Sequence, residues 1–77
     1  MAKPVLVLVD EGEVSRQALT RELDARYGAD YRIVSSSSPE LALGRLREFR
    51  ADGVAVPLVL AEQWMTGMTG TEFLARV

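Results

Sequence analysis

Apolar and polar positions alternate in blocks along the chain. Three short runs are almost wholly apolar: residues 4–9, 31–34 and 57–61. Continuous apolar runs of this length, rich in Val, Ile and Leu, are typical of strands in a parallel sheet that is covered on both faces. We therefore predict three strands, with the first in the centre of the sheet and the third also buried.

Helical spacing follows the first apolar run. Val14, Ala18, Leu23 and Tyr27 recur at or near the spacing of one helix face. Gly28 comes next, at the position where a residue in the left-handed conformation often ends a helix. These residues predict a first helix that ends at Gly28.

A second helix and the start of a third are predicted from their capping residues. Ser38 can cap, Pro39 suits the first helical position, and Glu40 suits the positive end of the helix dipole. The buried stripe of this second helix and the glycine that closes it are then Ala42, Leu46, Phe49 and Gly53. Further on, Thr69-Gly70-Thr71-Glu72 has the spacing of a capping box, and Phe73 follows within the predicted third helix.

Strands that alternate with helices predict an α/β fold with a parallel sheet. Because crossovers between parallel strands are right-handed, a central first strand gives the strand order 2-1-3 with helices on both faces. Such a sheet has a switch point between strands one and three, beyond the carboxyl ends of the strands, where ligands of open parallel sheets bind. We expect the chemistry of this chain at that edge.

Composition limits that chemistry. The 77 residues include no cysteine and no histidine, which excludes disulfides, thiolate nucleophiles, the usual zinc sites and a Ser-His-Asp triad. The formal charge is −2, and acidic and basic residues are interspersed, which argues against direct nucleic-acid binding. No apolar stretch is long enough for a membrane span or a signal peptide, so we expect a cytoplasmic chain without membrane contact.

Acidic residues follow both strands at the predicted switch point. Asp10 and Glu11 come directly after the first strand, and Glu62 comes directly after the third. Any one of them alone would be read as an ordinary solvated loop residue. Together they predict a pocket for Mg²⁺, which prefers oxygen ligands and would help to neutralise three neighbouring carboxylates.

These residues carry a family resemblance. Val9-Asp10-Glu11 and the stretch Leu60-Ala61-Glu62-Gln63-Trp64-Met65-Thr66-Gly67-Met68-Thr69-Gly70 resemble the receiver domains of bacterial response regulators. The resemblance implies that Asp10, Glu11 and the backbone carbonyl of Trp64 bind Mg²⁺, with Glu62 beside them at the phosphoacceptor position. It also implies that the residues after the third strand form the switch loop, among them Met65, Thr66, Gly67 and Gly70.

The resemblance implies a flavodoxin-like (βα)₅ fold, of which residues 1–77 would supply only the first three strands and the start of a third helix, an apparently incomplete domain. The receiver family carries aspartate where this chain has Glu62. The extra methylene moves the carboxylate away from in-line attack, so we expect a phosphorylation-independent module. A fixed mimic of the phosphorylated state and the loss of an unused site both remain open.

Function and partners are expected to follow the family. We expect a non-enzymatic signalling module of a two-component phosphorelay system, with a histidine kinase or a fused output domain as its partner. Residues 13–16 and 26–32 also resemble receiver modules fused ahead of thioredoxin-reductase-like flavoproteins, so a regulatory domain of such an oxidoreductase is one alternative, and a magnesium-dependent phosphohydrolase fragment is another. The open edge of the third strand predicts self-association. We expect Trp64, Met65 and Met68 to cover the core beneath a loop.

Overall fold

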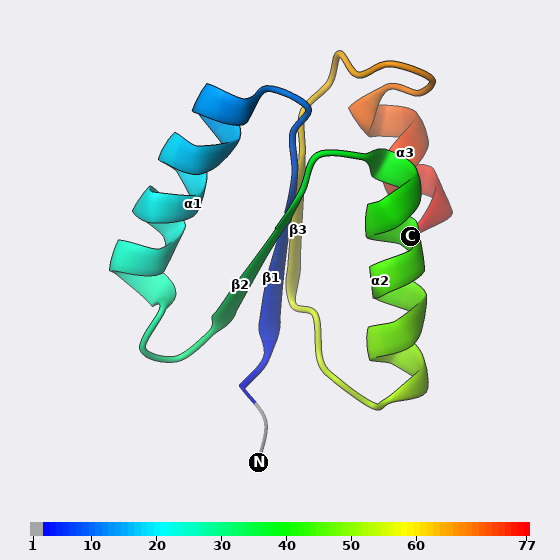
Figure 1. Cartoon of the computed structure of the whole chain (residues 1–77). Coiled ribbons are helices and arrows are strands. Elements are labelled where there is room, and N and C mark those ends of the chain that lie inside the picture. Colours follow the sequence, from blue (N-terminus) through cyan, green and yellow to red (C-terminus); the bar gives the residue numbers. More distant parts are fainter. Residues whose placement is uncertain (1–2) are drawn as a thin grey trace.

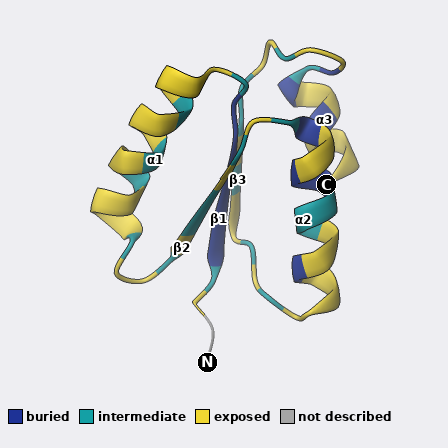
Figure 2. Ribbon diagram, viewed as in Figure 1, coloured by how far each residue is buried: buried dark blue, intermediate teal, exposed yellow. Residues whose placement is uncertain are grey.

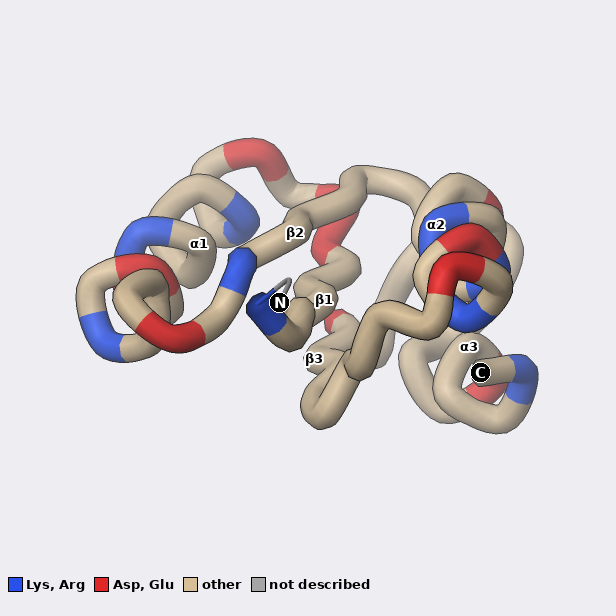
Figure 3. Tube along the Cα trace, turned by 90° about the horizontal axis from the view of Figure 1, so that it is seen from below, with Lys and Arg blue, Asp and Glu red and all other residues tan. Residues whose placement is uncertain are grey.

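The chain folds into a three-stranded parallel sheet with helices on both faces, as predicted (Figure 1). A computed structural model describes residues 3–77. Its elements, in chain order, are β1 (Val5–Val9), α1 (Glu13–Tyr27), β2 (Arg32–Ser36), α2 (Pro39–Ala51), β3 (Leu58–Ala61) and α3 (Gly70–Arg76). The strand order is β2-β1-β3. Seen along the strands, α1 lies on one side of the sheet and α2 and α3 lie on the other (Figure 3).

β1 is the centre of the core, and every one of its residues is buried (Figure 2). It pairs in parallel with both neighbours, so that Val7 lies between Val34 of β2 and Val59 of β3. Because side chains alternate across a strand, Val5, Val7 and Val9 share one face and pack with α2 and α3. Leu6 and Leu8 therefore face the α1 side.

α2 begins and packs as its sequence predicts. The Ser38 hydroxyl accepts a hydrogen bond from the Leu41 N–H at 3.3 Å, and Pro39 occupies the first turn. Ala42 and Phe49 are buried in the core, and Leu46 is half-buried at its margin. Gly53 has a φ of 70°, which a residue with a side chain rarely adopts, and it reverses the chain after the helix.

α1 is a helix as predicted, but the residues that recur at helical spacing do not form a buried face. Val14, Ala18 and Tyr27 are exposed, and Leu23 is only half-buried. α1 contacts β1 and β2 but not β3, so the sheet offers it a narrow apolar face. Gly28 is right-handed, with φ −61°, because the turn bonds from residues 30 and 31 to the Tyr27 carbonyl need no left-handed residue.

The structure also corrects two predictions about the strands. β2 extends beyond the predicted 31–34 and includes Ser35 and Ser36 of the serine run. β3 is not buried: Leu58 and Leu60 remain 43% and 38% exposed. They lie on the α1 face in register with Leu6 and Leu8, and no helix in the described part of the chain covers them. Within residues 3–77, no helix is both long and apolar enough to cross a membrane.

Candidate functional site

Asp10 is the buried carboxylate of the site. It follows β1 directly and is only 4% exposed. Ser15, in the first turn of α1, donates its hydroxyl to Asp10 Oδ2 at 2.7 Å, and the Gly12 N–H donates to Oδ1 at 2.8 Å. The chain thus folds back on the strand end and gives each carboxylate oxygen a donor.

These donors determine the ionisation of Asp10. Burial by itself would raise the pKa of this carboxyl, because the charged form loses water. The hydrogen bonds from Ser15 and Gly12 outweigh burial, with smaller contributions from Glu62 and the Arg16 charge, so the pKa of Asp10 lies below its usual value. Asp10 is therefore the charged member of the site.

Glu62 stands beside Asp10 at the end of β3. Its N–H donates to the Val9 carbonyl at 2.9 Å, which continues the pairing of β1 and β3 by one residue. Its carboxylate accepts the Glu11 N–H at 3.3 Å. The hydrogen bond to Asp10 favours a proton on Glu62, and partial burial adds to this, so the pKa of Glu62 is raised. Of the two carboxyl groups, Glu62 therefore takes up a proton more readily than Asp10.

The Glu11 side chain is bound by the loop that follows β3. Its Oε1 accepts hydrogen bonds from the Thr66 N–H at 2.7 Å and from the Thr66 hydroxyl at 3.3 Å. Glu11 therefore joins the end of β1 to the loop that follows β3. Of the three predicted acids, the structure brings Asp10 and Glu62 together and directs the Glu11 side chain to the loop.

The loop from Gln63 to Thr69 is closed by its own ends. The Gln63 side-chain oxygen accepts from the Thr71 N–H at 3.1 Å and from the Thr71 hydroxyl at 3.0 Å, and the Gly70 N–H donates to the Gln63 carbonyl. A Cβ on Gly70 would lie 2.5 Å from the Glu62 carbonyl oxygen, so only glycine fits there. Gly67 has a φ of 86°, which also requires glycine. Both predicted loop glycines thus have a structural role.

The three large side chains of the loop differ in burial. Met68 is buried in the core and Met65 packs against it from a half-buried position, as predicted. Trp64 is 78% exposed, so the prediction that it covers the core is wrong. Gly67, with its positive φ, lies in the loop between the exposed Trp64 and the buried Met68.

Three carboxylates at this edge of the sheet were predicted to bind Mg²⁺. Carboxylate oxygens suit Mg²⁺ chemically. Across residues 3–77, however, no group of three acidic side chains lies close enough to hold one ion. Both oxygens of Asp10 already accept hydrogen bonds, and Glu11 is held by Thr66. The predicted ligand set of Asp10, Glu11, Glu62 and the Trp64 carbonyl would therefore need Glu11 to leave Thr66.

Sequence reasoning missed three residues that support the site. Ser15 donates to the Asp10 carboxylate, Arg16 donates to the Asp10 carbonyl at 3.1 Å, and Gln63 holds the start of α3. A serine and an arginine five and six residues after an acidic strand end lie on the first turn of the following helix. That spacing was the available signal, whereas nothing in the sequence indicated the role of Gln63.

Comparison with known proteins leaves the family open. No family model matches the chain, and no curated protein matches it. The resemblance to receiver domains therefore rests on the motif residues themselves, and what it implies for function enters below as a proposal.

Proposed function

We propose that the chain is a receiver-type regulatory module, not an enzyme, and that its acidic pocket acts without phosphorylation. The observation that supports this is the engagement of Glu62. Its carboxylate accepts the Glu11 N–H at 3.3 Å, and the neighbouring Asp10 raises its pKa, so the group at the phosphoacceptor position is already engaged. A phosphoryl donor would have to displace the Glu11 contact before Glu62 could attack in line.

The contacts also suggest how the pocket acts on its surroundings. Glu62 contacts the backbone of Glu11, and the Glu11 side chain holds Thr66 in the loop. The residue after Glu62, Gln63, holds Thr71 in the first turn of α3. A change at Glu62 would therefore reach the loop and α3 through hydrogen bonds at two points. In this proposal the loop and α3 form the regulatory surface.

Exposure to acetyl phosphate tests the proposal. The wild-type chain is expected to keep its intact mass, because Glu62 is engaged and its longer side chain misplaces the carboxylate. Glu62→Asp serves as the matched variant, since it shortens the side chain by one methylene and keeps the charge. A stable gain of one phosphoryl group on Glu62 in the wild-type chain would overturn the proposal.

Magnesium binding stays a prediction of the family resemblance. Few protein ligands are offered, and Mg²⁺ retains waters when this is so, so binding should need millimolar metal. The exposed Trp64 lies next to the predicted carbonyl ligand and gives a fluorescence signal. Thr66→Val removes one of the two hydrogen bonds that hold Glu11 and should strengthen binding, whereas Asp10→Asn should abolish it. No response in any of these variants would count against a metal site.

The partner is proposed to be a histidine kinase, a fused output domain or a fused flavoprotein oxidoreductase that the module regulates. The contacts of Asp10 do not support the phosphohydrolase alternative, because both of its carboxylate oxygens already accept hydrogen bonds. We also propose self-association through the edge of β3, supported by the exposure of Leu58 and Leu60 on that strand.

A further inference from the structure

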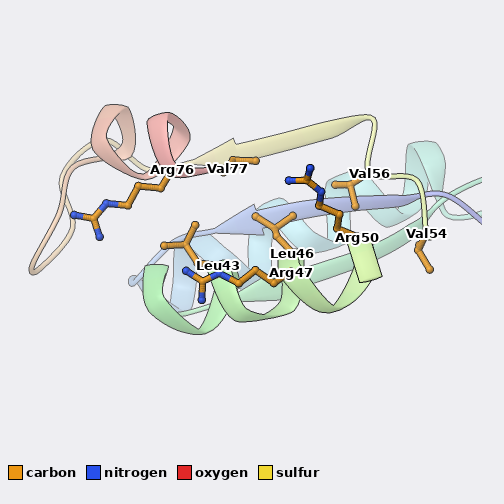
Figure 4. Close-up of a pocket in the computed structure, with 8 residues that line it drawn as sticks. All are labelled: Leu43, Leu46, Arg47, Arg50, Val54, Val56, Arg76 and Val77. Carbon is orange, nitrogen blue, oxygen red and sulfur yellow. The ribbon is translucent and has the colours of Figure 1, made fainter. Parts of the chain in front are cut away.

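An opening into the apolar core lies between α2 and the end of α3. It has a volume of about 460 Å³ and lies on the side of the sheet opposite α1 (Figure 4). Its floor is apolar and comprises Leu43, Leu46, Val54, Val56 and Val77. Leu43 belongs to the core cluster, and Leu46, Val54 and Val56 pack against it while remaining half-buried. We call this opening the α2–α3 groove.

Three arginines surround this floor. Arg47 and Arg50 belong to α2, and Arg76 belongs to α3. Arg50 and Arg76 lie in the last turns of their helices, where the helix dipole already favours a cation. Arg47 lies before the last turn of α2, so the helix dipole does not explain its positive charge. Figure 4 shows Arg76 and Arg50 on either side of the two leucines, so the positive charges are spread along the groove.

Within residues 3–77, none of these arginines forms an ion pair with an acidic side chain. In the part of the chain that the structure describes, the only ion pair joins Arg26 to Glu22, on α1. The pKa of Glu72 is lowered mainly by its hydrogen bonds with Thr69 and also by the charge of Arg76, but the Glu72 and Arg76 side chains form no ion pair. The whole chain is slightly acidic, with a formal charge of −2, so this positive cluster is a local feature.

We propose that the α2–α3 groove binds an amphipathic helix of a partner protein, with apolar side chains on the leucine and valine floor and acidic side chains toward Arg47, Arg50 and Arg76. Separated charges favour a partner with several carboxylates over an amphiphile with a single anionic head. The groove walls are helix side chains and loop residues, and no β3 residue lines it, so strand addition is not the mode of recognition. Leu43 and Arg50 span two helical turns, about 10 Å, which matches anchors at i, i+3, i+4 and i+7 of a docked helix.

The probe is a fluorescein-labelled 18-residue helical peptide with leucines at that spacing and glutamates on both flanks. Its anisotropy is measured with the full 77-residue chain at low and high salt. Binding should weaken as salt rises, because exposed charges are screened. The double variant Arg47→Glu with Arg50→Glu should bind at least about tenfold more weakly. Arg21→Glu, with half that charge change and on exposed α1, is the control and should bind as wild type.

Charge reversal separates recognition from misfolding. A peptide with lysines in place of the glutamates should bind the double variant better than it binds the wild-type chain. Amide shifts in the NMR spectrum should map to Leu43, Leu46 and Val56 in the wild-type complex. These two results would support the proposal even if the double variant were less stable.

Four outcomes would overturn the proposal. The acidic peptide could fail to bind at millimolar concentration, or the Arg21→Glu control could lose as much affinity for it as the double variant does. Dodecanoate could displace the peptide and bind more tightly than the peptide, or the double variant could lose self-association. The third would make the occupant a single-headed amphiphile, and the fourth would make it a second copy of this chain.

Discussion

Asp10 is a buried charge with two hydrogen-bond donors, one of which is a hydroxyl. Ser15 donates to it at 2.7 Å, and this contact is among the causes of the lowered pKa of Asp10. Removal of a donor from a buried carboxylate leaves that oxygen without a partner, which costs more than the loss of a neutral hydrogen bond.

Ser15→Ala should therefore lower the free energy of unfolding by about 1–2 kcal/mol at pH 7. The matched control is Ser37→Ala, an exposed serine in the loop before α2. Urea unfolding of both variants measures the difference. Equal stabilities would show that water replaces the Ser15 hydroxyl and that the contact does not stabilise the fold.

Glu62 and Asp10 give opposite dependences on pH. The lowered pKa of Asp10 stabilises the folded state above its usual value of 3.8, and this contribution is lost as the pH falls through the folded pKa. The raised pKa of Glu62 does the reverse: its contribution is present below 4.5 and is lost as the pH rises through the folded pKa. The site is therefore most favourable between pH 3.8 and 4.5, where Asp10 is charged and Glu62 holds a proton.

Glu62→Gln should remove the loss of stability above pH 4.5 and raise the melting temperature at pH 7. The amide can donate to Asp10 and accept from the Glu11 N–H without adding charge. Thermal unfolding from pH 4 to pH 8 tests this, and the variant should show the flatter curve. A parallel shift of the whole curve would mean that Glu62 does not titrate with folding.

At the scale of elements, α3 depends on its cap. The helix has seven residues, too few to persist through its own backbone bonds. The Thr69 hydroxyl accepts the Glu72 N–H at 3.1 Å, and the Glu72 carboxylate accepts the Thr69 N–H at 3.1 Å. Phe73, which is fully buried, then anchors the helix to the core.

Thr69→Ala should cost about 1 kcal/mol and should increase hydrogen exchange across α3 before it affects β1. Thr69→Ser keeps the hydroxyl and should restore most of the protection. Exchange followed by mass spectrometry or NMR gives the comparison. If the two variants exchanged alike, the threonine methyl rather than the cap would be the stabilising group.

Capping and turn residues predicted the elements better than periodicity did. Ser38, Pro39 and the Thr69–Glu72 box act through local bonds, so the sequence alone was enough to place α2 and α3. For α1, periodicity predicted the helix but not its burial, because burial of Val14 or Tyr27 depends on what the opposite layer supplies. In the site, the adjacency of Asp10 and Glu62 followed from strand order, whereas the rotation of Glu11 toward Thr66 depended on a loop conformation that no spacing encodes.

At the scale of the whole molecule, the two faces of the sheet are unequally covered. α2 and α3 enclose Val5, Val7 and Val9 on one face, whereas α1 alone covers the other and does not reach β3. Leu58 and Leu60 are therefore apolar side chains on a strand whose outer backbone edge is unpaired within residues 3–77. Exposed apolar edges of this kind pair with other strands, and charged side chains on an edge oppose such pairing.

We therefore expect the chain to self-associate through β3, with a sedimentation-average mass and a melting temperature that both rise with concentration. Leu60→Lys places a charge on the exposed face of the edge strand and should shift the chain toward monomer. Leu41→Lys is the control, since Leu41 is 66% exposed on α2 and lies away from this edge.

The α2–α3 groove is not lined by β3, so Arg47→Glu with Arg50→Glu should leave the association unchanged. A wild-type chain that stays monomeric, with cooperative melting independent of concentration, would show that Leu58 and Leu60 are tolerated in water and that the open edge has no partner.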